Sequence, residues 1–191
     1  QENARVGGLK YADLDGNGLI NADDQTWILN PVPDFSYGIN VGLDYKGFDL
    51  TVFLQGVQGV QVYNGQKFQT DFWSLTDAGS NKGSRLLGAW TTANTSSLIP
   101  ALTTNNTGDE GRASTYFVEN GSYLKVRDLS LGYNLPTDVL QKCKLSKLRF
   151  YLSGHNLLTL KSKSLTCKDP ENPNWAYPLA TSVTFGVQVG F

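Results

Sequence analysis

The 191-residue sequence contains no methionine, only one histidine and only two cysteines. Its first residues show neither the charged region nor the apolar region of a signal peptide, so we expect that Gln1 is not where the gene product begins. The cysteines, Cys143 and Cys167, form no CxxC pair and are too few for a disulfide framework. They therefore say little about the cellular compartment.

Long apolar runs and an excess of one charge are also missing. No apolar run approaches the roughly 18 residues of a membrane-spanning helix, which excludes an α-helical membrane protein but not a barrel of strands. The 16 Lys and Arg residues nearly balance the 17 Asp and Glu residues, so nucleic-acid binding and polybasic membrane binding are excluded. An aromatic content of 12% excludes a disordered chain.

The clearest pattern that is present is a strict alternation of apolar and polar residues over positions 36–45. Successive side chains of a β-strand point to opposite faces of its sheet, so this pattern predicts a strand with one apolar face. Lys46 and Gly47 then supply a two-residue turn, and the alternation resumes from Phe48. Tyr45 and Phe48 are expected to face each other across this hairpin.

The same alternation recurs further along the chain. Together with the hairpin, it predicts strands within residues 35–56, 122–133, 147–156 and 182–191. In the second of these ranges the phase of the alternation flips, which predicts a β-bulge near Arg127 and Asp128.

The predicted connections differ in length. Lys46-Gly47 and residues 134–146 are short turns, in the second of which Pro136 can start one helical turn. Residues 57–121 and 157–181 are long stretches rich in Gly, Asn, Ser and Thr, and we expect them to be loops. Short turns at one end and long loops at the other are typical of outer-membrane barrels.

The predicted strands are roughly 9–12 residues long, which is the length that crosses a bilayer at the tilt of a barrel. We therefore predict an all-β fold in which residues 35–191 are the C-terminal antiparallel strands of a transmembrane β-barrel. Residues 1–34 are predicted to form an extracellular loop. The alternative is a secreted carbohydrate-binding β-sandwich with a dockerin-like calcium loop, since some sandwiches also place their long loops at one end.

A candidate calcium site lies within residues 13–24. Oxygen donors fall at the positions that a twelve-residue calcium loop requires, with Gly18 at the sharp turn. The candidate ligands are Asp13, Asp15, Asn17, the carbonyl of Leu19, Asn21 and Asp24. The alternative is a metal-free loop whose Asp and Asn side chains hydrogen-bond to their own backbone.

Four stretches, in this order and at this spacing, resemble the C-terminal part of SusC/RagA-type TonB-dependent outer-membrane transporters of Bacteroidota. They cover nearly the whole chain, which makes the match more specific than any single motif. The stretches are Gly7 to Gly18 running into Asn30 to Gly38, Tyr45 to Leu50 with Phe53 to Gly56, Gly121 to Tyr133, and Ser153 to Thr159.

This resemblance implies a barrel of about 22 strands with an N-terminal plug, located in the bacterial outer membrane. It also implies a SusD-like surface lipoprotein as a lid, and import of glycans or peptides with energy delivered through TonB. The present chain would contribute the last strands and their loops. The plug and the TonB box of a full family member are not in this sequence.

No catalytic constellation is evident, and we predict that the chain is not an enzyme. His155 has no serine or cysteine partner at a recognisable spacing and is interpreted as a hydrogen-bonded residue at a strand end. Aromatic residues in the long loops could stack on sugars, dock the lipoprotein, or pack within the loops themselves. These residues are Trp73, Trp90, Tyr116 and Trp175.

Overall fold

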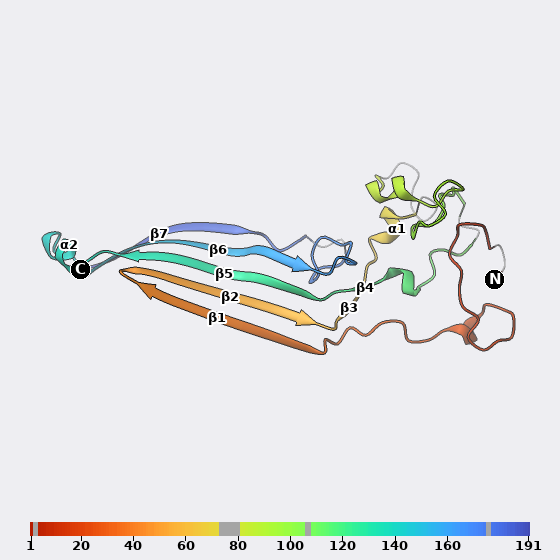
Figure 1. Ribbon diagram of the computed structural model, residues 1–191, viewed down its shortest axis with the longest axis horizontal. Helices are drawn as coiled ribbons and strands as arrows, with labels where there is room; N and C mark the ends of the chain where they lie inside the picture. The colour runs from red at the N-terminus through yellow and green to blue at the C-terminus, as the bar shows by residue number, and fades with distance from the viewer. Residues whose placement is uncertain (2–3, 73–80, 106–107, 175–176) are drawn as a thin grey trace. The chain divides into compact units, whose positions relative to one another are not determined.

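A computed structural model of the chain describes residues 1, 4–72, 81–105, 108–174 and 177–191. Five long strands form one antiparallel sheet in the order β1-β2-β5-β6-β7 (Figure 1). The all-β prediction is confirmed, and among the described residues no helix is long and apolar enough to cross a membrane. The elements are η1 (Ala22–Asp24), β1 (Phe35–Tyr45), β2 (Phe48–Gln58), β3 (Gln61–Tyr63), α1 (Lys67–Thr70), η2 (Ser84–Gly88), η3 (Thr115–Phe117), β4 (Val118–Asn120), β5 (Tyr123–Asn134), α2 (Thr137–Lys142), β6 (Lys147–Lys161) and β7 (Ser182–Gly190).

The β1–β2 hairpin follows the sequence prediction residue by residue. Its register pairs Tyr45 with Phe48, and the turn consists of Lys46 and Gly47. Both turn residues have positive φ, 47° and 87°. Two successive residues with positive φ give the twist that matches the two flanking strands, and glycine adopts that conformation without steric cost.

The predicted bulge in β5 is confirmed at Arg127. On the β2 side, Phe53 pairs with Asp128 and the next residue, Leu54, pairs with Val126, so Arg127 has no cross-strand partner. The register to β6 also shifts at this point. Since side chains alternate with a period of two, one extra residue restores the apolar side chains of the second half of β5 to the same face.

The sheet has two chemically distinct faces. In one cross-strand row, Leu43, Leu50, Leu131, Leu152 and Phe185 lie opposite one another on the five strands. The neighbouring row carries Gly42, Thr51, Ser130, Ser153 and Thr184 and belongs to the other face. We call these the apolar face and the polar face. The apolar face is not covered by the described part of the chain: Phe185 is 68% exposed and Leu43 58%.

The short connections share one end of the sheet. The β1–β2 turn, α2 and the C-terminal residue lie together there (Figure 1), and backbone hydrogen bonds from Asn134 to Gly47 and from Ser146 to Gly190 join them. Pro136 precedes the first turn of α2, as predicted. The long connections leave from the opposite end of the strands.

Two strands run clearly past their predicted ends. β2 continues to Gln58, two residues beyond the predicted end at residue 56. β6 continues to Lys161, five residues beyond the predicted end at residue 156, because its last residues pair with the first residues of β5. His155 therefore lies within the strand and not at its end, which corrects the sequence interpretation. The alternation is weak here because Asn156, with a φ of 51°, interrupts the pleat.

The chain divides into two compact units, and most of the predicted 57–121 loop belongs to the one without the sheet. That unit contains residues 1–29, 63–119 and 173–175. Its core is centred on Phe117, which is fully buried and stacks on Phe68 with ring centroids 4.4 Å apart. Lys67 and Glu119 form a buried ion pair of 2.9 Å in the same unit. The long connection is thus a folded body with its own core.

Candidate functional site

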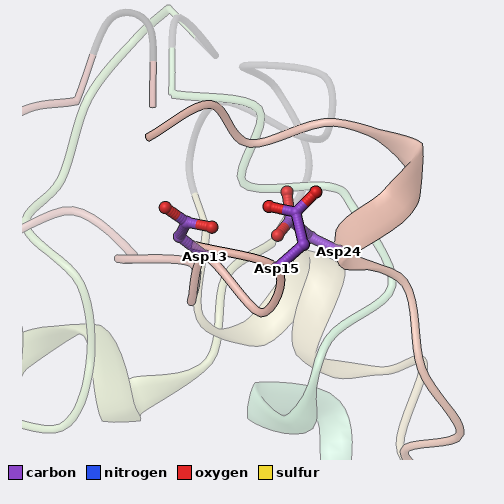
Figure 2. Close-up of side chains that lie close together, drawn as sticks. All are labelled: Asp13, Asp15 and Asp24. Atoms are coloured by element: carbon purple, nitrogen blue, oxygen red, sulfur yellow. The ribbon is translucent and has the colours of Figure 1, made fainter. Parts of the chain in front are cut away.

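The candidate calcium loop brings three of its six predicted ligands together. The carboxylates of Asp13, Asp15 and Asp24 each place an oxygen within 4.8 Å of the others, and Figure 2 shows the three side chains converging. Gly16 and Gly18 have φ values of 78° and 80°, which permits the tight turn between the first ligands.

The same carboxylates also accept hydrogen bonds from the backbone. Asp13 accepts from Gly16 and Gly18 at 2.7 Å each, and Asp24 accepts from Leu14 at 2.7 Å and Asn21 at 2.8 Å. The bonds from Asn21 and Leu14 lower the pKa of Asp24, so this carboxyl is ionised at neutral pH.

Two of the other predicted ligands, the side chains of Asn17 and Asn21, have local partners. The side-chain oxygen of Asn17 accepts from the backbone of Leu19, and that of Asn21 caps η1 by accepting from Asp23. Both the calcium prediction and the metal-free alternative include such turns. A divalent cation would offset the repulsion between carboxylates at this spacing.

At the short-turn end of the polar face, an ion pair spans three strands. Arg149 on β6 donates from Nε to Oδ2 of Asp49 on β2 at 2.9 Å, and a second guanidinium nitrogen bonds Oδ1. Asn134 donates to the same carboxylate at 3.1 Å. The pair lies over Gly132 of the intervening strand β5, where an added Cβ would be 2.3 Å from Oδ2 of Asp49.

At the long-loop end of the polar face, a charged cluster joins β5 to the loop after β6. Lys125 is only 1% exposed and donates from Nζ to Asp169 at 2.8 Å and to Glu171 at 2.6 Å. Glu171 also accepts from the hydroxyl of Tyr123 at 2.6 Å and from the guanidinium of Arg127. The cluster contains two cations and two carboxylates, so its formal charge is zero.

These interactions set the ionisation of the two loop carboxyls. Burial raises the pKa of Asp169, but the hydrogen bond and charge of Lys125 outweigh burial and hold that pKa below its usual range. The pKa of Glu171 is lowered in the same way, against the effect of burial, by Lys125 and by the hydroxyl of Tyr123. Both groups are therefore carboxylates at neutral pH.

Sequence reasoning missed this cluster. It identified Arg127 only as a bulge position and assigned no role to Lys125, Asp169 or Glu171. The available signal was the alternation itself, which places Tyr123 and Lys125 on the polar face. Their loop partners lie 44 to 48 residues further along the chain, in a segment without periodicity.

The remaining residues singled out in the sequence have structural partners. The imidazole of His155 on β6 contacts the carboxylate of Asp128 on β5. Tyr116 packs edge-on against Phe72 and Phe117 and donates its hydroxyl to Asp71 at 2.7 Å, in agreement with packing within the loop. Neither Cys143 nor Cys167 forms a disulfide, and Cys143 is exposed whereas Cys167 is buried.

Of the three tryptophans singled out in the sequence, the structure describes one. Trp90 is half-buried and lies against Gly7, so it also packs within its own unit. Trp73 and Trp175 lie outside the described residues.

Comparison with known proteins gives several relatives of one kind. TonB-dependent receptor P3 of Formosa agariphila is 38% identical over 80% of this chain and 14% of its own length. TonB-dependent receptor P26 of the same organism is 30% identical over 97% of this chain and 20% of its own. TonB-dependent receptor SusC of Bacteroides thetaiotaomicron is 30% identical over 95% of this chain and 17% of its own.

Solved structures agree with the sequence comparison. The RagAB peptide importer in its closed-closed state matches with a TM-score of 0.75 and 28% identity, over 94% of this chain and 20% of the matched chain. The structure of the RagAB peptide transporter matches with a TM-score of 0.74 and 26% identity, over 91% and 19%. No family model matches. The chain spans about a fifth or less of the length of these proteins, and the resemblance found in the sequence is confirmed.

Proposed function

Because the chain corresponds to a segment of a SusC/RagA-type TonB-dependent receptor, we propose that it forms part of the wall of an outer-membrane nutrient importer. The five-stranded sheet is the proposed wall segment. Its apolar face contacts lipid, its polar face lines the interior, and the strands that close the barrel lie outside this sequence. In this proposal the chain has no catalytic role.

The observation that carries this proposal is the exposed apolar face. Rows of Leu, Val, Ile and aromatic side chains run across all five strands with no second layer over them in the described part of the chain. Water would penalise such a surface by about 25 cal/mol for each Å² exposed, whereas lipid would not. The aromatic row of Tyr45, Phe48 and Tyr133 at the short-turn end fits the interfacial girdle of a barrel.

The rival β-sandwich is less consistent with this surface. A sandwich buries the apolar faces of two sheets against each other. In the described residues the second sheet consists only of the short strands β3 and β4, which is too small to cover five strands of 9 to 15 residues.

The proposed partners are those of a complete importer of this kind. They are the rest of the barrel and its plug, a SusD-like surface lipoprotein as lid, and the TonB complex as energy source. The proposed cargo is an oligosaccharide or a peptide. Similarity to the RagAB peptide importer supports peptides, and similarity to SusC leaves oligosaccharides open.

Growth and uptake measurements test this proposal. Cells that carry a receptor with this segment and its lipoprotein should take up the labelled solute only when TonB is present. Supplying peptides and oligosaccharides separately distinguishes the two cargo classes. Recovery of the receptor in the soluble fraction, and not in detergent-extracted outer membrane, would contradict the proposal.

We also propose that residues 13–24 bind Ca²⁺. Asp13, Asp15 and Asp24 would supply carboxylate oxygens, and the Leu19 carbonyl together with the side chains of Asn17 and Asn21 would complete the ligand set. Asp at the last loop position is shorter than Glu, so the affinity should be weak. The ion would order the loop and would take no part in chemistry.

The calcium proposal predicts a local effect. Asp13→Ala combined with Asp15→Ala should loosen residues 10–30, seen as faster backbone hydrogen exchange, while the barrel stays folded. Adding calcium should slow exchange in this loop in the unmodified protein and in Asp34→Ala, but not in the double variant. Asp34→Ala, which alters an exposed carboxylate outside the loop, is the matched control. Unchanged exchange at about 1 mM calcium, a concentration typical of extracellular modules, would rule out the site.

A further inference from the structure

The loop after β6 folds back over the polar face of its own sheet. Residues 162–172, which we call the strap, receive contacts from side chains on the polar face of β5 and β6. These contacts come from Tyr123, Lys125, Arg127 and Lys161. All of these residues belong to one compact unit, so the contacts are internal to it.

Burial alternates from one residue to the next along part of the strap. Leu165, Cys167 and Asp169 are buried, whereas Thr166 and Lys168 between them are exposed. The strap therefore has an inner side against the sheet and an outer side that faces away from it. Lys168 is one of the exposed residues of this outer side, and Lys163, which precedes the alternating stretch, is exposed as well.

The inner side is held by charges that cannot separate without cost. Lys125 is buried between Asp169 and Glu171, and Arg127 holds Glu171 from the bulge of β5. Removing one partner of a buried ion pair leaves an uncompensated charge, which is far less favourable than the intact pair. The cluster of Lys125, Arg127, Asp169 and Glu171, which we call the clamp, is neutral and keeps the strap on the sheet. It therefore does not offset the positive charge of the exposed lysines of the strap.

We propose that the strap is a constriction that determines specificity at the long-loop end of the polar face, where its exposed lysines favour anionic solutes. This inference rests on the proposed function, because the polar face must line the transport path. Lys125 is a positioning residue that holds the strap, and Lys163 with Lys168 are the residues that meet the solute. The solute class is one that carries carboxylates, such as acidic peptides or uronate-containing oligosaccharides.

The native cysteines report directly on the clamp. Cys167 on the inner side is 1% exposed, and Cys143 beside α2 is exposed. In a detergent-solubilised receptor that carries this segment, a maleimide should label Cys143 rapidly and Cys167 slowly. In Lys125→Met, labelling of Cys167 should accelerate about tenfold or more while labelling of Cys143 stays unchanged.

Two further variants keep this test decisive. Lys10→Met removes an exposed lysine of the other compact unit and should change neither labelling rate. If Lys125→Met does not yield folded barrel, Glu171→Gln should give a smaller acceleration, since Asp169 still pairs with Lys125. If Cys167 still labels slowly in folded Lys125→Met or Glu171→Gln, the proposal that the clamp holds the strap on the sheet is wrong.

The specificity role has its own measurement. Uptake of an acidic and a neutral peptide of equal length is compared, and likewise of an acidic and a neutral oligosaccharide. Lys163→Gln with Lys168→Gln should lower the ratio of acidic to neutral uptake about tenfold while Cys167 stays protected. An unchanged ratio would overturn the constriction. Absence of any TonB-dependent uptake in the unmodified receptor would overturn the proposed function instead, and the cysteine labelling would still decide the clamp.

Discussion

At Gly132 the missing side chain allows an ion pair to form. Asp49 and Arg149 are separated by 100 residues in the chain and meet directly above this glycine of β5. Gly132→Ala would place a Cβ 2.3 Å from Oδ2 of Asp49 and 2.5 Å from Nε of Arg149. The carboxylate and the guanidinium must then separate, and both charges lose their partner on the polar face.

We expect Gly132→Ala to lower the free energy of unfolding of the barrel by about 1–3 kcal/mol, the usual range for overpacking. Denaturant unfolding in detergent or lipid measures this. Gly42→Ala on the same face is the control, because nothing lies within 4 Å of its added Cβ. Equal stability of the two variants would show that the ion pair tolerates the methyl group.

At the scale of elements, the clamp between β5 and the strap should be insensitive to pH over the physiological range. The pKa values of Asp169 and Glu171 are lowered in the folded state, so their contribution is complete above the usual carboxyl pKa of about 4 and is lost only as pH falls through the lower folded values. Labelling of Cys167 should therefore stay slow from about pH 5 to about pH 8, after correction for the reactivity of the thiol measured at Cys143. Release at about pH 6 would mean that another group controls the strap.

The connections between strands give a second prediction at this scale. Short turns of outer-membrane barrels face the periplasm and long loops face outside. An impermeant maleimide should therefore label Thr104→Cys on intact cells, and should label Lys46→Cys only after the outer membrane is permeabilised. Both positions are exposed. Labelling of Lys46→Cys alone on intact cells would reverse the proposed orientation.

At the scale of the whole molecule, the sheet cannot be a complete membrane structure by itself. β1 and β7 are its edges in the described part of the chain, and in lipid each unpaired backbone group costs several kcal/mol. In water the same fragment would expose its apolar face. In the proposed barrel, both edges would therefore pair with strands outside this sequence.

We accordingly expect residues 1–191 expressed alone to be insoluble, as judged by fractionation and size-exclusion chromatography. Co-expression with the remaining strands of a receptor should restore heat-modifiable, membrane-inserted material. A soluble, monodisperse monomer of 20.9 kDa that unfolds cooperatively would instead support the β-sandwich.

The strands, their two faces, the hairpin and the bulge at Arg127 followed from the sequence, because alternation and turn chemistry are local properties that any stretch of chain reports by itself. The resemblance to a receptor family followed for the same reason, from the order of such stretches. The ligand positions of the calcium loop could also be written down, since they lie within twelve residues, and the structure brings three of the carboxylates together.

The tertiary structure alone decided which polar side chains meet. Lys125 could have faced solvent, an open interior or a partner, and only the return of the chain after β6 places Asp169 and Glu171 beside it. The extension of β6 to Lys161 and the folded core around Phe117 depend on the same kind of contact between distant segments. Such pairings are set by packing and charge compensation across many residues, which leave no periodic trace in the sequence.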